Sequence, residues 1–196
     1  MATAGVLQIH PSLRCNLSCH HCYSSSGPDQ RGWLDDDTLA DLVSDAAALG
    51  YATLAVSGGE PLMFPGLDTL LRNAHEAGMR TMVTTNGTLV TPRRLEELDP
   101  VLDLLAFSLD GPPDVHNAVR NAPWAFAKLD RGLAAAASLA SVGSASAGTV
   151  QPPRQTTISY KLLDWRCCGV PADIFTHFED LGGLTIPSTG QIAFGG

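Results

Sequence analysis

Short apolar runs of strand length alternate with helical patterns through the first two thirds of this chain, and no other feature constrains the fold more strongly. The apolar runs cover residues 6–9, 53–56, 80–84 and 102–108. Helical spacing of apolar residues and helix-ending signals predict helices over 36–49, 66–77 and 123–139, with a further helix opening at Thr91 and Pro92. A strand followed by a helix, repeated four times, predicts βα units and a parallel sheet, and therefore an α/β fold.

Composition and charge narrow the class of protein further. The chain has 196 residues, of which 44% are hydrophobic, and this is enough for one domain with a sizeable core. Its formal net charge of −8 argues against a surface that binds nucleic acid, so we expect no such partner. No window of about 18 strongly apolar residues is present, so we expect no membrane span. The first 13 residues lack the pattern of a secretory signal, and a cytoplasmic location is expected.

Three cysteines, Cys15, Cys19 and Cys22, form a C-x3-C-x2-C loop directly after the first expected strand. Three thiolates at this spacing can hold three corners of a cubic [4Fe-4S] cluster and leave one iron open, whereas ferredoxin-type clusters use a fourth cysteine. The alternative is a structural zinc site, because His20 and His21 lie within the C-x2-C part of the loop. No second ligand pair of the kind that zinc fingers use is found between residues 23 and 49, which favours the cluster.

The loops after the other expected strands also carry unusual residues. They read Gly58-Gly59-Glu60-Pro61, Thr85-Asn86-Gly87 and Ser108-Leu109-Asp110-Gly111. Each has an ordinary interpretation, namely a tight turn, a turn with positive φ, and a loop stiffened by the prolines that follow Gly111. The Glu60 carboxylate is an odd choice for a turn but suits an ammonium partner. Because the loops at the carboxyl ends of parallel strands meet on one face, we expect all four loops to form one site.

Taken in order, these four loops resemble the radical S-adenosylmethionine (SAM) superfamily. The resemblance covers about residues 7–140 and implies a partial (βα) TIM-like barrel of the radical SAM type, in which about four of the usual six βα units are recognisable. It also implies two cofactors, a [4Fe-4S] cluster and S-adenosylmethionine. Within the superfamily, the chain resembles the group whose members modify peptides.

The resemblance also implies roles for individual residues. Cys15, Cys19 and Cys22 are expected to bind the cluster, with the methionine part of SAM on the fourth iron. The imidazole of His21 and the main chain at Tyr23 are expected near the adenine. The methionine ammonium is expected at Gly58, Gly59 and Glu60, and the ribose and carboxylate at Asn86, Ser108 and Asp110.

The activity implied by the resemblance is that of a radical SAM oxidoreductase or maturase. Such an enzyme cleaves SAM reductively to a 5′-deoxyadenosyl radical, which abstracts hydrogen from a peptide or small-molecule substrate. The electron comes from a donor such as flavodoxin or ferredoxin. Two alternatives stay open: a truncated, non-catalytic remnant that binds the cluster without turnover, and a zinc-binding interaction module.

The βα pattern does not continue through the last part of the chain. Residues 138–148 are rich in serine, alanine and glycine, where a buried fifth strand would show branched apolar side chains. We therefore expect a radical SAM core over residues 1–140 and a divergent or aberrant tail over 141–196, as in a truncated or frame-disrupted family member. A short strand over 157–163 and a helix over 174–181 are compatible with the sequence. Cys167 and Cys168 are expected to be ordinary thiols.

Overall fold

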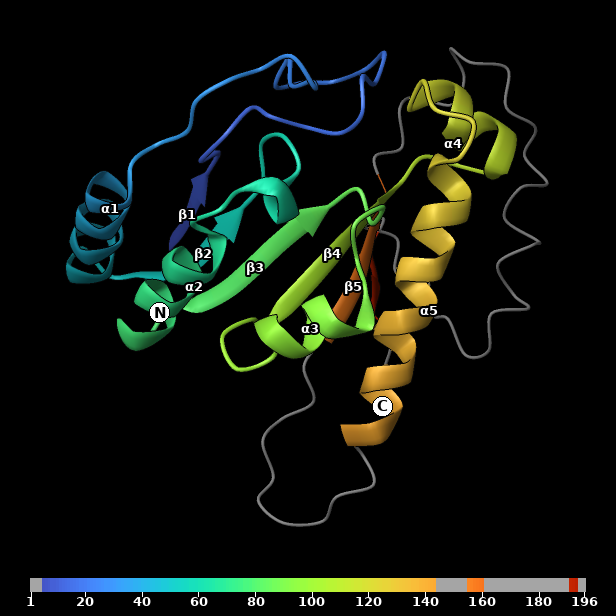
Figure 1. Ribbon diagram of the computed structural model, residues 1–196. Coiled ribbons are helices and arrows are strands. Elements are labelled where there is room, and N and C mark those ends of the chain that lie inside the picture. The colour runs from blue at the N-terminus through green and yellow to red at the C-terminus, as the bar shows by residue number, and fades with distance from the viewer. Residues whose placement is uncertain (1–4, 144–154, 161–190, 194–196) are drawn as a thin grey trace.

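The computed structural model describes residues 5–143, 155–160 and 191–193. Its centre is one six-stranded sheet in which the strands follow one another in chain order (Figure 1). The strands are β1 (Gly5–Ile9), β2 (Tyr51–Val56), β3 (Arg80–Thr85), β4 (Leu104–Leu109), β5 (Gln155–Tyr160) and β6 (Gln191–Ala193). The first five strands are parallel to their neighbours, and β6 is antiparallel to β5. The carboxyl ends of the parallel strands therefore share one edge of the sheet.

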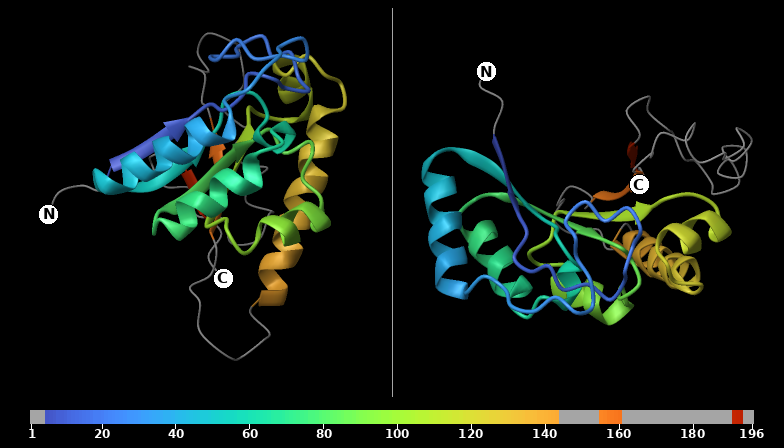
Figure 2. Two further views of the ribbon diagram at one scale, coloured as in Figure 1. Left: turned by 60° about the vertical axis from the view of Figure 1, so that its left-hand side comes forward. Right: turned by 90° about the horizontal axis from the view of Figure 1, so that it is seen from above.

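In the described part of the chain, helices follow each of the first four strands and cover one face of the sheet (Figure 2). They are α1 (Asp36–Ala48), α2 (Leu67–Glu76), α3 (Pro92–Leu98), α4 (Pro113–Val119) and α5 (Ala125–Gly143), with a short 3-10 helix, η1 (Pro61–Met63). Figure 2 shows α1, α2, α3 and α5 on the same side of the sheet. This is the arrangement of successive βα units, in which each crossover returns along one face.

Local sequence signals explain where two of these helices begin. The Asp35 carboxylate accepts a hydrogen bond from the main-chain N–H of Thr38 and so caps α1. Thr91 caps α3 in the same way through the main-chain N–H of Arg94, and Pro92 takes the first helical position. Both caps satisfy main-chain donors that a helix start leaves without an internal partner.

The core lies between the sheet and these helices. Its fully buried side chains include Leu54, Val56, Val83 and Phe107 from the strands, and Leu39, Leu67, Leu71 and Leu129 from the helices. Each such side chain contributes about 1.5–3 kcal/mol through its removal from water. This packing fixes the positions of the strand ends, and therefore of the loops that leave them.

The four predicted strands are present, and their ends lie within two residues of the predicted ones. One prediction is corrected by the structure: the segment after Asp110 is not only a stiffened loop. Pro112 and Pro113 open the helix α4, because proline is well suited to the first turn of a helix. The second proline of the pair thus starts a short helix that the apolar periodicity does not reveal.

The sheet continues into the segment that the sequence pattern separates as a tail. Residues 155–160 form β5, which pairs in parallel with β4 from Leu104 to Leu109. The helix expected over 174–181 and the pair Cys167 and Cys168 lie outside the described residues. The division of the chain at residue 140 stays a prediction.

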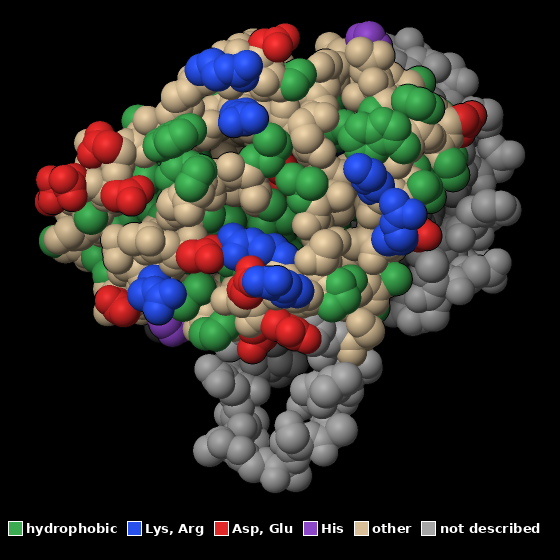
Figure 3. Space-filling view, viewed as in Figure 1, with side chains coloured by type: hydrophobic (Ala, Val, Ile, Leu, Met, Phe, Trp, Pro, Cys, Tyr) green, Lys and Arg blue, Asp and Glu red, His purple; other side chains and the backbone are tan. Residues whose placement is uncertain are grey.

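The charge of the surface and the character of the helices can be compared with the expectation of no nucleic-acid partner and no membrane span. Acidic side chains gather over α1, where Asp36, Asp37, Asp41 and Asp45 are exposed (Figure 3). No helix in the described part of the chain combines the length and the apolar character needed to cross a membrane.

Candidate functional site

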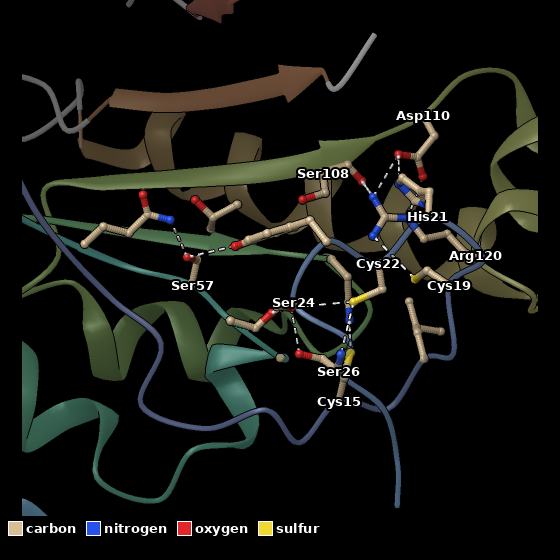
Figure 4. A pocket seen from close by; sticks show the side chains of 17 residues that line it. Cys15, Cys19, His21, Cys22, Ser24, Ser26, Ser57, Ser108, Asp110 and Arg120 are labelled. Carbon is tan, nitrogen blue, oxygen red and sulfur yellow. Dashed lines mark hydrogen bonds and ion pairs between the residues drawn. The ribbon is translucent and has the colours of Figure 1, made fainter. Parts of the chain in front are cut away.

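A cavity of about 400 Å³ lies where the loops after β1, β2, β3 and β4 converge (Figure 4). Cavities of this size hold cofactors and other small ligands in many proteins. All three cysteines of the first loop line it, together with residues of the other three loops, among them Gly58, Gly59, Asn86, Ser108 and Asp110. The predicted convergence of the four loops on one site is therefore present in the structure.

The cysteine loop rests directly on the glycine pair that follows β2. The main-chain N–H of Gly59 donates to the Ser12 carbonyl at 3.0 Å, and that of Glu60 donates to the Arg14 carbonyl at 2.9 Å. A Cβ atom on Gly59 would lie 2.0 Å from the Arg14 carbonyl oxygen, and Gly58 has a φ of +106°. Glycine is required here because another stretch of backbone crosses in contact with the turn.

The far end of the cysteine loop is held by the end of α4. The main-chain N–H of His20 donates to the Val119 carbonyl at 3.0 Å, and the His20 side chain is exposed. Within the loop, the N–H of Cys22 donates to the Cys19 carbonyl at 3.3 Å and closes a turn. The loop is thus fixed at both ends by elements far away in the sequence.

Two of the cysteine sulfurs have side-chain hydrogen-bond donors from other loops. Asn86 Nδ2 lies 3.7 Å from the sulfur of Cys15, and Arg120 Nη1 lies 3.8 Å from the sulfur of Cys19. Burial raises the pKa of the Cys15 thiol to about 11. Burial also raises the pKa of Cys19, although the charge of Arg120 acts in the opposite direction.

The third sulfur, that of Cys22, is surrounded by donors from its own loop. The main-chain N–H of Ser26 donates to it at 3.3 Å, and the Ser24 hydroxyl lies 3.5 Å away. Burial alone would raise the pKa of Cys22, but the hydrogen bonds from Ser24 and Ser26 outweigh it, and the pKa is lowered. The lowered pKa favours the thiolate of Cys22, which is the form that binds metal.

Asp110, after β4, is the centre of a buried charged network. Its side chain is 2% exposed, and its two oxygens accept from Nε and Nη2 of Arg120. His116 Nδ1 lies 3.2 Å from Oδ2, and His21 Nε2 lies 3.3 Å from Oδ1. Burial by itself would raise the pKa of Asp110, but the hydrogen bond from His116 and the charge of Arg120 lower it below the ordinary value.

Glu60, after β2, is not among the residues that line the cavity and is 2% exposed. Its carboxylate accepts hydrogen bonds from the Thr85 hydroxyl at 2.7 Å, the Asn86 N–H at 2.8 Å and the Leu62 N–H at 3.1 Å. Burial raises its pKa. This geometry gives Glu60 a structural role, because it ties the β2 loop to the β3 loop. Its predicted contact with an ammonium group stays a prediction.

Asn86 connects the β3 loop to the cysteine loop. Its Nδ2 donates to Asn16 Oδ1 at 3.0 Å, and its Oδ1 accepts from the N–H and the hydroxyl of Thr88. The next residue, Gly87, has the positive φ expected of an Asn-Gly turn, here +77°. A Cβ atom on Gly87 would lie 2.4 Å from Cδ1 of Leu129 on α5, so the turn is packed closely against that helix.

The remaining predicted residues also lie at the cavity. His21, Tyr23 and Ser108 all line it, and the Ser108 carbonyl accepts from Arg120 Nη2 at 3.3 Å. The Tyr23 hydroxyl lies 3.1 Å from His10 Nε2, and Tyr23 is 59% exposed. Of the predicted site residues, Glu60 is the one whose side chain does not line the cavity.

The sequence pattern missed Arg120, His116 and the serines beside Cys22. His116 and Arg120 are four residues apart around α4 and therefore face the same side, towards Asp110. This spacing was the available signal, but it has meaning only once the segment is known to be a helix. Ser24 and Ser26 have no spacing that separates them from ordinary loop serines.

The donor set distinguishes between the two kinds of metal site considered from the sequence. Within residues 5–143, 155–160 and 191–193, no three His, Cys, Asp or Glu side chains are grouped to hold a single metal ion. A [4Fe-4S] cluster makes a different demand, because here three of its irons would each take one thiolate and the fourth would stay open. Three thiols around one cavity fit the cluster.

Comparison with known families agrees with this chemistry. The family model of the Radical SAM superfamily matches residues 9–151, which is most of the chain. The chain belongs to the radical SAM superfamily. Members of this superfamily use a [4Fe-4S] cluster and SAM, so the prediction of these two cofactors is confirmed at the level of the family.

Curated relatives carry out several different reactions. An AdoMet-dependent heme synthase of Methanosarcina barkeri is 35% identical over 122 residues, covering 61% of this chain and 35% of the relative. A PqqA peptide cyclase of Ruegeria pomeroyi is 40% identical over 118 residues, covering 59% of this chain and 32% of the relative. The chain thus spans about a third of the length of these relatives.

Solved structures with low sequence identity share the fold. Native anSMEcpe with bound AdoMet and the Cp18Cys peptide superposes with a TM-score of 0.68 at 21% identity, covering 91% of this chain and 48% of that one. SuiB of Streptococcus suis, bound to its precursor peptide SuiA, gives a TM-score of 0.60 at 23% identity, covering 73% and 32%. The predicted fold class, a partial barrel of the radical SAM type, is confirmed.

Proposed function

We propose that this chain binds a [4Fe-4S] cluster through Cys15, Cys19 and Cys22, binds SAM beside it, and acts as a radical SAM enzyme. The observation that carries the proposal is the cavity of about 400 Å³ at the carboxyl ends of the parallel strands. It brings three cysteine sulfurs together with the polar loops after β2, β3 and β4. A cluster with three cysteine ligands keeps one iron open for a second ligand.

When bound, the reduced cluster and SAM supply a 5′-deoxyadenosyl radical, which abstracts hydrogen from the substrate. The protein holds the three thiols in place through the contacts of the cysteine loop with Gly59, Glu60 and Val119. Gly58 and Gly59 line the cavity, and the methionine ammonium is proposed to bind beside them. A site that excludes water limits side reactions of a radical with water and other hydrogen donors.

The remaining contacts to SAM are proposed from the same cavity wall. His21 and the main chain at Tyr23 would lie beside the adenine, and Asn86 and Ser108 beside the ribose and carboxylate. Asp110 lines the cavity as well, but its two oxygens are engaged by Arg120, His116 and His21. Its contribution to SAM binding is therefore proposed to be indirect.

We further propose a peptide or a small molecule as the substrate. One relative is a peptide cyclase at 40% identity and another is a heme synthase at 35% identity, so both substrate classes occur among the relatives of this chain. A low-potential donor such as flavodoxin or ferredoxin is proposed to supply the electron. The cytoplasm, which is reducing, is the compartment that suits such a cluster.

Anaerobic reconstitution with iron and sulfide tests the proposal. We expect about four irons per chain, a brown chromophore, and 5′-deoxyadenosine after addition of SAM and dithionite. Cys15→Ser, Cys19→Ser and Cys22→Ser should each lower the iron content severalfold and abolish 5′-deoxyadenosine. The matched control is Cys168→Ser, which should keep both. A colourless protein, or an iron content unchanged by the three substitutions, would refute the cluster assignment.

The alternative is a protein that holds the cluster without turnover. Every described residue that lines the cavity lies between Gln8 and Arg120, so the part of the site seen here comes from the cluster-binding half of the chain. The same experiment separates the two functions. A full complement of iron with no 5′-deoxyadenosine would support the non-catalytic alternative.

A further inference from the structure

We propose that Arg120 is a positioning residue that acts on the cluster through Cys19, and that the Asp110–Arg120 pair sets the reduction potential of the cluster. The inference rests on the proposed function, because it requires a cluster bound to Cys19. It adds a role for two residues beyond the binding of iron and SAM.

The geometry places the Arg120 guanidinium between a carboxylate and a thiol. Its Nε and Nη2 donate to the two oxygens of Asp110, and its Nη1 lies 3.8 Å from the sulfur of Cys19 (Figure 4). A guanidinium has five N–H donors in a rigid plane, so an arginine fixed by a carboxylate on one edge presents another N–H in a set direction. Here that direction is towards a cluster ligand.

Burial strengthens the electrostatic effect of the Asp110–Arg120 ion pair on nearby groups. The side chain of Arg120 is 11% exposed and that of Asp110 is 2% exposed. Little water is available to screen the two charges, so their effect on a nearby charged group is larger than it would be at the surface. The Ser108 carbonyl accepts from Nη2 at 3.3 Å and helps to keep the guanidinium in place.

The backbone around Arg120 is also fixed to the cysteine loop. The N–H of Arg120 donates to the His116 carbonyl at 2.9 Å, at the end of α4. The preceding residue, Val119, accepts from the N–H of His20, which directly follows Cys19. The main chains that carry the Arg120 donor and the Cys19 sulfur are therefore joined by a hydrogen bond between neighbouring residues, which keeps the two groups close together.

The three sulfurs differ in the charge of their donors. Cys15 receives a neutral amide N–H from Asn86, and Cys22 receives the neutral main-chain N–H of Ser26. Among the contacts of the described residues, the donor to Cys19 is the charged one. The cluster would therefore have one corner under the influence of a buried ion pair.

This asymmetry has a consequence for electron transfer. One electron from a low-potential donor protein, or from dithionite in the test, makes the cluster more negative by one unit. Positive charge and N–H donors near the sulfurs favour the more negative state and raise the potential, whereas negative charge lowers it. Arg120 should therefore raise the reduction potential, and Asp110 should lower it.

The test compares reconstituted variants by redox titration monitored by electron paramagnetic resonance, at one fixed pH. Arg120→Gln removes a positive charge and should lower the midpoint potential. Asp110→Asn removes a negative charge and should raise it. The double variant keeps the net charge of the wild type but lacks the charged donor, and its potential should lie below that of the wild type. Arg93→Gln is the matched control, because Arg93 is 89% exposed on α3, and it should leave the potential unchanged.

Opposite shifts for the two single variants are the decisive result, because a purely structural role would move the potential in the same direction for both. Equal shifts, or potentials equal to that of Arg93→Gln, would overturn the inference while the proposed function stands. If Arg120→Gln fails to hold iron, Arg120→Lys and Asp110→Asn decide instead. Lysine keeps the charge, so Arg120→Lys should hold the potential near that of the wild type, and Asp110→Asn should raise it. A lowered potential in Arg120→Lys, with no rise in Asp110→Asn, would also refute the inference. Failure of the wild-type chain to assemble a cluster would remove the proposed function itself.

Discussion

Two buried carboxylates, Glu60 after β2 and Asp110 after β4, occupy similar places in two βα units, but their surroundings differ. Glu60 is surrounded by neutral donors, the Thr85 hydroxyl and the N–H groups of Asn86 and Leu62. Asp110 is surrounded by Arg120 and two histidines. Burial raises the pKa of Glu60, whereas the partners of Asp110 outweigh burial and lower its pKa.

The difference shows how one residue type serves two purposes in one site. The Glu60 carboxylate joins the β2 and β3 loops by hydrogen bonds and does not line the cavity. Asp110 instead holds a cation at the wall, next to Cys19. A loop that must only be fixed can use neutral donors, whereas a charge that must act on a neighbouring ligand needs a counter-charge to stay buried.

Replacement of Asp110 by alanine should give the largest loss of stability. Arg120 then stays buried without its carboxylate, and breaking a buried ion pair in this way costs about 3–5 kcal/mol. Urea denaturation followed by circular dichroism measures the free energy of unfolding. Asp41→Ala, on the exposed side of α1, is the matched control and should change it by less than about 0.5 kcal/mol. A loss as small as that of the control would contradict a buried ion pair at this position.

Replacement of Glu60 by alanine should give a smaller loss, of about 1–3 kcal/mol. Three buried donors lose their acceptor, but burial already disfavours the charged carboxylate, and its removal relieves that cost. The same denaturation assay applies, with the exposed Glu96→Ala on α3 as control. A larger loss for Glu60→Ala than for Asp110→Ala would reverse the proposed difference between the two regions.

The smallest effect concerns the pH dependence of stability, which should differ in sign between the two carboxylates. The lowered pKa of Asp110 stabilises the folded protein at pH values above the ordinary aspartate pKa of about 3.9. This stabilisation is lost as the pH falls through the folded-state pKa. The raised pKa of Glu60 stabilises the folded protein at pH values below the ordinary glutamate pKa of about 4.3. This stabilisation is lost as the pH rises through the folded-state pKa.

Two isosteric variants test this sign. Asp110→Asn should flatten the fall of stability on the acid side, and Glu60→Gln should flatten the fall on the side towards neutral pH. Each change of slope is at most about 1.4 kcal/mol per pH unit, the value for one proton. Denaturation curves between pH 3 and 8 measure both. Slopes that change on the same side of the curve for both variants would show that the two surroundings do not differ as described.

Much of the fold follows from local sequence, and so do the cluster ligands. The four strands could be predicted because buried parallel strands show as short apolar runs, and α3 because Thr91 and Pro92 form a recognisable start. The helix α4 was missed, because a seven-residue helix is too short to show a periodic pattern. Arg120 was not predicted either, because its role depends on that helix.

The order of residues alone determined the three thiols of the cysteine loop, the βα repeat and the family to which the chain belongs, because each is carried by spacing along a short stretch. Only the tertiary structure decided which side chains meet around the cavity. Cys19 and Arg120 are 101 residues apart, and Glu60 and Thr85 are 25 apart. The physical reason is that a side chain's neighbours are chosen by the packing of whole elements against one sheet, and that packing is not encoded in any local pattern.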